Sequence, residues 1–234
     1  MKLTKKKVFV TALAVCLIAI LSFGTIAWFT ASDEVTNQFK VTTSDEEGTP
    51  DFSVDLFEHK VNPDTGDRVS NDEVETNTYN NVLPGSELDK DPTARNTGSY
   101  DQWIRVKVTL NNYDVWCDAL NNGNLYDFSE ILKGIGTEWS HNPVTDRTFS
   151  GDGKTATFTY YLNSPLLAAK NNGGVAGEAT LFTSVEIPSG FTVDNMKFNG
   201  TEDGVFNLNV VAEAVQRENI ADSCRDAFAI IDGQ

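Results

Sequence analysis

The 234-residue chain has few of the residues that build catalytic centres: it contains two histidines, three cysteines and two methionines. His59 and His141 stand far apart, so the His-Glu-x-x-His spacing of a zinc peptidase is missing. The Gly-x-Ser-x-Gly turn of a serine hydrolase and the glycine-rich loop that cradles phosphate are missing too. The sequence therefore predicts no catalytic, cofactor-binding or metal-ligating set of residues.

Positive charge is also scarce, with 18 Lys and Arg against 34 Asp and Glu and a net charge of -16. A surface of this sign repels nucleic acid and anionic lipid, so we expect neither as a partner. Two acidic clusters are candidate calcium sites, one at 45–47 and one formed by Asp64 and Asp67 around Gly66. Neither has EF-hand spacing, so solvated loops are the preferred interpretation and calcium stays a weak alternative.

The N-terminus has the three parts of a secretory signal. Four lysines lie within the first seven residues, an apolar run covers 8–21, and small residues follow up to Ala27. We expect a signal peptide over 1–27, cleaved between Ala27 and Trp28. The alternative is an uncleaved anchor, because a bilayer span needs about 20 apolar residues. On either interpretation this segment is the chain's sole predicted contact with a membrane.

Cleavage would leave two cysteines, Cys117 and Cys224, because Cys16 lies inside the apolar run. An even number of cysteines in an exported protein is compatible with one disulfide. Two buried thiols are the other interpretation, since spacing alone does not fix disulfide geometry.

Most of the remaining chain has the patterns of short strands. Apolar and polar residues alternate over 52–56 and most clearly over 103–110. Strands are also predicted over 155–162, after the Gly151–Gly153 turn, over 181–187, and over 205–216. Residues 70–81 are polar and are predicted to form a loop. Helical spacing predicts short helices near 126–135 and 219–231.

This pattern predicts an all-β fold, a jelly-roll-like antiparallel β-sandwich with those two short helices, preceded by the signal peptide. We divide the chain into a signal peptide at 1–27, an N-terminal segment at 28–39, and a β-sandwich domain at 40–234.

Four segments in order resemble the TasA/camelysin family of exported Gram-positive proteins. They are the junction GTIAWFT at 24–30 with DEVTNQF at 33–39, the Pro-Gly turn and Asn-Thr-Gly-Ser corner within VLPGSELDKDPTARNTGS at 82–99, the stretch from YYL at 160–162 to VEIP at 185–188, and VAEAVQ at 211–216. The resemblance implies a jelly-roll sandwich, processing by a SipW-type signal peptidase, and a structural role at the cell surface or in the biofilm matrix.

The resemblance also implies fibres, which some members of that family form. In such fibres the N-terminal segment of one subunit completes the sheet of the next. The candidate donor strand here carries Trp28, Phe29, Val35 and Phe39, and its partners would be other copies of this chain or other matrix proteins. Local pairing within one subunit is the alternative. The camelysin name also carries a protease label, so a cell-surface metallo-endopeptidase is the alternative function. A monomeric adhesin or ligand-binding module is a third hypothesis.

Overall fold

The protein folds as antiparallel β-sheets with two α-helices in a computed structural model, which describes residues 30–34, 52–80, 82–120, 128–192 and 206–233. The first sheet has six strands in the order β1-β13-β6-β10-β8, with β9 paired to β10. Its strands are β1 (Thr30–Glu34), β6 (Gln102–Asn111), β8 (Trp139–Ser140), β9 (Arg147–Phe149), β10 (Thr155–Leu162) and β13 (Leu208–Gln216).

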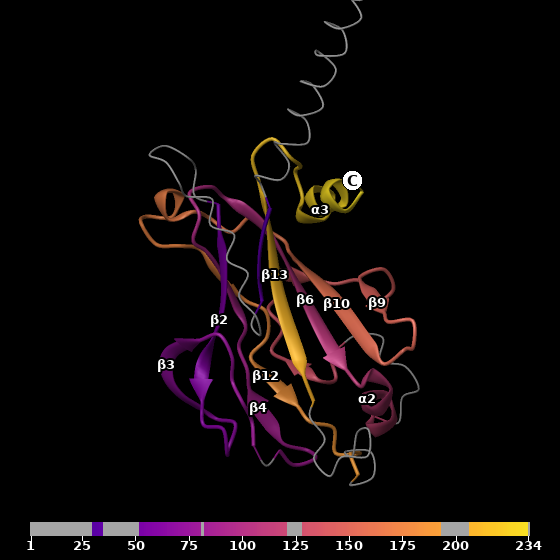
Figure 1. The fold of residues 1–234 in the computed structure, drawn as a ribbon. Coiled ribbons are helices and arrows are strands. Elements are labelled where there is room, and N and C mark those ends of the chain that lie inside the picture. The colour runs from indigo at the N-terminus through magenta and orange to yellow at the C-terminus, as the bar shows by residue number, and fades with distance from the viewer. Residues whose placement is uncertain (1–29, 35–51, 81, 121–127, 193–205, 234) are drawn as a thin grey trace, which may run out of the picture.

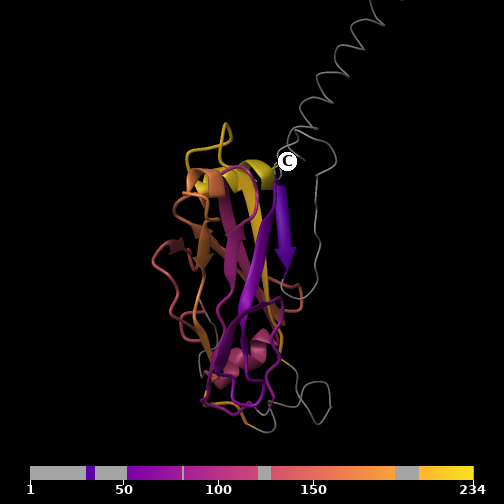
Figure 2. The same cartoon turned by 90° about the vertical axis from the view of Figure 1, so that its left-hand side faces the viewer.

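Two smaller sheets form the opposite layer, as Figure 2 shows from the side. A four-stranded sheet has the order β11-β5-β2-β3, and a three-stranded sheet has the order β4-β12-β7. Their strands are β2 (Val54–Val61), β3 (Arg68–Val74), β4 (Glu87–Asp89), β5 (Thr93–Asn96), β7 (Leu132–Lys133), β11 (Glu178–Thr180) and β12 (Ser184–Glu186). The predicted all-β, antiparallel, layered class is therefore confirmed.

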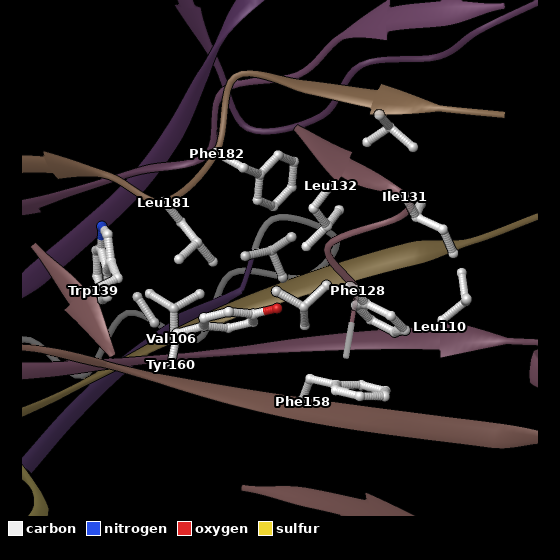
Figure 3. Close-up of a cluster of buried hydrophobic side chains, with 14 of the residues drawn as sticks. Val106, Leu110, Phe128, Ile131, Leu132, Trp139, Phe158, Tyr160, Leu181 and Phe182 are labelled. Atoms are coloured by element: carbon white, nitrogen blue, oxygen red, sulfur yellow. The ribbon is translucent and has the colours of Figure 1, made fainter. Parts of the chain in front are cut away.

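The core lies between the layers and follows from the alternation of the long strands. On β6 the apolar residues Ile104, Val106, Val108 and Leu110 are at most 1% exposed, and β13 and β10 add further residues to the same face. Figure 3 shows how the opposite layer meets them: Leu181 and Phe182 point toward Phe158 and Tyr160 of β10. This continuous cluster is what holds the sheets together.

Two helices lie at opposite ends of the six-stranded sheet (Figure 1). Helix α2 (Tyr113–Ala119) follows β6, and helix α3 (Cys224–Asp232) follows β13. Because β6 and β13 are antiparallel, their C-terminal ends point in opposite directions, and so the helices are far apart. Helix α3 begins at an N-cap, Ser223, whose hydroxyl accepts a hydrogen bond from the Asp226 N–H. Of the described helices, none has the length and apolar character needed to cross a bilayer.

The helix predicted near 126–135 is wrong where it can be compared. Residues 128–131 form a turn, in which the N–H groups of Ile131 and Leu132 both donate to the Phe128 carbonyl, and β7 follows at once. Phe128, Ile131 and Leu132 are fully buried. Their helix-like spacing arises because a single turn packs these side chains on the core, and no helix forms over 128–135. The C-terminal helix is confirmed over Cys224–Asp232, shorter than the predicted 219–231 segment at its start.

Candidate functional site

The edge of the six-stranded sheet is the place where the predicted N-terminal segment meets the domain. Strand β1, with the sequence TASDE, pairs antiparallel with β13 from Thr30↔Val215 to Glu34↔Val211. It also contacts β2 of the other layer, so it lies along one open side of the sandwich, as Figure 2 shows. Strand β1 is the terminal strand of this sheet, and its pairing covers five residues of β13.

Helix α3 packs on the outer face of the same sheet and is fixed there by two arginines. Arg105 of β6 donates to the carboxylates of Asp232 and Glu213, and its guanidinium lies 4.2 Å from the centre of the Phe228 ring. Burial lowers the pKa of Arg105, but the hydrogen bond that Arg105 donates to Asp232 and the charge of Glu213 outweigh burial and raise it. The end of α3 is thus tied to the middle of the sheet.

Arg225, at the start of α3, makes the second attachment. Its two terminal nitrogens reach Asp146 Oδ1 at 2.8 Å and Oδ2 at 2.6 Å, and its guanidinium lies 4.3 Å from the centre of the Tyr161 ring. Burial alone would raise the pKa of Asp146, but the hydrogen bond from Arg225 and the Asn142 N–H hold it below its ordinary value. Helix α3 therefore has a charge-assisted contact at each end.

A shallow recess of about 620 Å³ lies where β13 turns toward α3. It is lined by Trp103, Pro165 and the segment 217–222, and the indole N–H of Trp103 donates to the Ala221 carbonyl at 3.2 Å. Asn219 in this segment has a φ of 64°, in the left-handed region that asparagine tolerates. Because Thr30 pairs with Val215, the N-terminal end of β1 lies next to this segment.

The sequence-predicted site residues are placed only in part. Ala27, Trp28, Phe29, Val35 and Phe39 lie outside the described residues. Between them, Thr30–Glu34 is described, and in this single chain it pairs with its own β13. The local pairing that the sequence left open as an alternative is therefore the arrangement in the isolated chain.

Cys117 and Cys224 are both buried, and both are free thiols. They lie on α2 and α3, at opposite ends of the sheet (Figure 1), whereas a disulfide needs Cα atoms within about 7 Å of each other. The disulfide that the sequence left open is not formed in this structure. Burial raises the pKa of the Cys224 thiol to about 12, and the thiol donates to the Ile104 carbonyl at 3.1 Å.

The two histidines have separate local partners. His59 on β2 binds Asp91 through Nδ1 at 2.6 Å, and His141 contacts the Thr159 carbonyl at 2.9 Å and stacks on Tyr160. Within the described ranges, no group of three or more His, Cys, Asp or Glu side chains is arranged to hold a metal ion. Asp64 and Asp67 are exposed beside the Gly66 turn, and the acidic cluster at 45–47 lies outside the described residues.

One polar cluster was missed by the sequence analysis. Glu58 on β2 is fully buried, and its carboxylate binds both the Lys90 ammonium and the Asn77 side-chain amide. A signal for it exists, because Glu58 takes the next inward position after Phe52, Val54 and Leu56 in the strand alternation. The predicted strand ended at Leu56, and so Glu58 was not recognised as an inward-facing residue.

Comparison with known protein families, with curated proteins and with solved structures finds no match to this chain.

Proposed function

We propose that this chain is a secreted structural protein of the cell surface or extracellular biofilm matrix, without enzymatic activity, which assembles by exchange of its N-terminal strand. In this proposal a SipW-type signal peptidase releases the chain at Trp28, and the sandwich has jelly-roll topology. The observation that carries the proposal is the position of β1, a terminal strand paired to the sheet edge at β13.

The composition of β1 favours exchange. Its five residues, Thr-Ala-Ser-Asp-Glu, include no large apolar side chain, so little hydrophobic free energy ties the strand to its own subunit. Backbone hydrogen bonds provide the pairing, and the same bonds form equally well with β1 of another copy. Removing β1 would leave the N–H and C=O groups of the β13 edge open to another strand.

The surroundings of β1 give the exchanged strand a place to anchor. The N-terminal end of β1 lies beside the recess lined by Trp103 and 217–222. Trp28 and Phe29 directly precede Thr30, so exchange would bring two aromatic side chains to the recess of a neighbouring subunit. Burying each large side chain contributes about 1.5–3 kcal/mol. An exchanged strand that carries these two aromatic residues is therefore held more tightly than the five residues of β1 alone would be.

Electron microscopy of two purified proteins tests the proposal. Protein that begins at Trp28 is expected to form filaments or concentration-dependent oligomers. Protein that begins at Lys40 lacks the donor strand and is expected to stay monomeric. If both stay monomeric at high concentration, or both polymerise alike, the N-terminal strand is not the connector.

A further inference from the structure

The buried cluster around Glu58 contains an amine and a carboxamide on one carboxylate. Lys90 Nζ donates to Glu58 Oε1, and Asn77 Nδ2 donates to Glu58 Oε2 at 3.1 Å. The side chain of Glu58 is 0% exposed and that of Lys90 is 10% exposed. A carboxylate that touches both groups and is itself shielded from water can carry protons from one to the other.

We propose that Lys90 and Asn77 join through an intramolecular isopeptide bond, with Glu58 as the proton-transferring catalytic residue. The Lys90 ammonium first gives a proton to Glu58, which leaves a neutral amine. The Nζ lone pair then forms a bond to Cγ of Asn77.

Collapse of the tetrahedral intermediate breaks the bond from Cγ to Nδ2. Protons pass through Glu58 from Nζ to the departing nitrogen, which leaves as ammonium. The products are one secondary amide, one ammonium ion and the regenerated Glu58 carboxylate. Atoms and charge balance without an oxidant, a reductant or any other reactant.

The contacts of Asn77 suit the carboxamide for attack. Its carbonyl oxygen accepts a hydrogen bond from the Val61 N–H at 3.1 Å, which stabilises the negative charge that develops on that oxygen. Its Nδ2 donates to the His59 carbonyl at 2.9 Å as well as to Glu58. The side chain is thus held from both ends by β2, which limits its motion before the reaction.

Other lysine–carboxylate pairs in the described part of the chain lie in a different environment. Lys133 binds Glu186 at 2.9 Å, but these side chains are 36% and 47% exposed. Water surrounds such a pair, and solvent exposure weakens the interaction between its two groups. Lys133 is therefore the internal control, and its amine is expected to stay unmodified.

The bond would cross-link the segment after β3 to the residue after β4, and so close the 77–90 loop covalently around β2. Closing a loop of this size is expected to raise the melting temperature by on the order of 5–10 °C and to protect the loop from proteolysis.

Intact-mass measurement of the denatured, reduced protein tests the bond. The wild-type protein is expected to be lighter than its sequence by one ammonia, about 17 Da, and its digest to contain a branched peptide that joins Asn77 to Lys90. Lys90→Arg keeps the positive charge but cannot form the bond, so it should show the full sequence mass. Glu58→Gln should lose most of the bonded form, and Asn77→Asp should lose water in place of ammonia.

Full sequence mass in the folded wild-type protein would overturn the proposal. So would a loss of ammonia without the branched peptide, because a succinimide at Asn122-Gly123 or another Asn-Gly step loses the same mass. The result is independent of fibre assembly, since the bond lies within one subunit and can be measured in the protein that begins at Lys40.

Discussion

The two edges of β13 hold their neighbouring strands by different means. Toward β6 the pairing runs over nine residue pairs, with buried apolar residues on the inner face and ion pairs of Arg105 and Lys107 with Glu213 on the outer face. Toward β1 it runs over five pairs, to a strand of small and acidic residues. In our proposal the edge toward β6 is permanent, and the edge toward β1 is the one where another copy replaces the partner strand.

The largest expected effect comes from the permanent edge. Ile104 on β6 is fully buried opposite Ala214, so Ile104→Ala is expected to lower the free energy of unfolding by about 2–5 kcal/mol. Removing residues 28–39 entirely should cost less than this one substitution, because β1, the described part of that segment, has the sequence TASDE and carries no large apolar side chain. Urea denaturation of the two proteins measures both values. A larger loss in the protein that begins at Lys40 would show that β1 is an integral strand.

A smaller effect is expected at the α3 contact. Arg225→Met removes the partner that lowers the pKa of Asp146, and Arg225 is 40% exposed, so we expect a loss of about 1 kcal/mol at pH 7. A depressed carboxyl pKa stabilises the fold above the unfolded value of about 3.9, and this stability is lost as pH falls through the folded pKa.

The difference between wild type and Arg225→Met should therefore shrink below about pH 4. Urea midpoints measured from pH 7 down to pH 2.5 give this difference. Lys133→Met is the matched control, because the Lys133–Glu186 pair is exposed at the surface. A difference that stays constant with pH would mean that Arg225 acts by packing on Tyr161 alone.

The smallest expected effect concerns the thiols. Since Cys117 and Cys224 are buried and free, a reductant should leave the melting temperature unchanged. Both thiols of the processed protein should react with a thiol reagent in denaturant and stay unreactive in the folded state. A drop in melting temperature on reduction would instead indicate a disulfide in the secreted protein.

The long central strands could be predicted from the sequence, and the irregular ones could not. Alternation located 103–110 and 155–162 because each has one buried face, and the observed β6 and β10 agree within two residues. Most of strand β3 (Arg68–Val74) falls within the loop predicted over 70–81, since an edge strand exposed on both faces has no apolar alternation. Helix α2 has seven residues, too few to give a clear period.

The candidate sites were predictable to different degrees. A donor segment could be proposed because motif order around 24–39 resembles a known family. The contacts of Arg105 and Arg225 could not, because they join residues 127 and 79 positions away in the chain. The Lys90, Asn77 and Glu58 cluster likewise depends on the register of β2 and on the turn after β3.

A cysteine trap across β1 and β13 tests strand exchange most directly. Glu34 and Val211 are opposite each other in the pairing, at a Cα separation that antiparallel strands hold near 4.5–5.5 Å, which suits a disulfide. Protein carrying Glu34→Cys and Val211→Cys is assembled, oxidised and run on a non-reducing denaturing gel beside the Glu34→Cys single variant. Strand exchange predicts a ladder of covalent multimers from the double variant and none above dimer from the single one. Assembled protein that yields only internally cross-linked monomer would contradict the account.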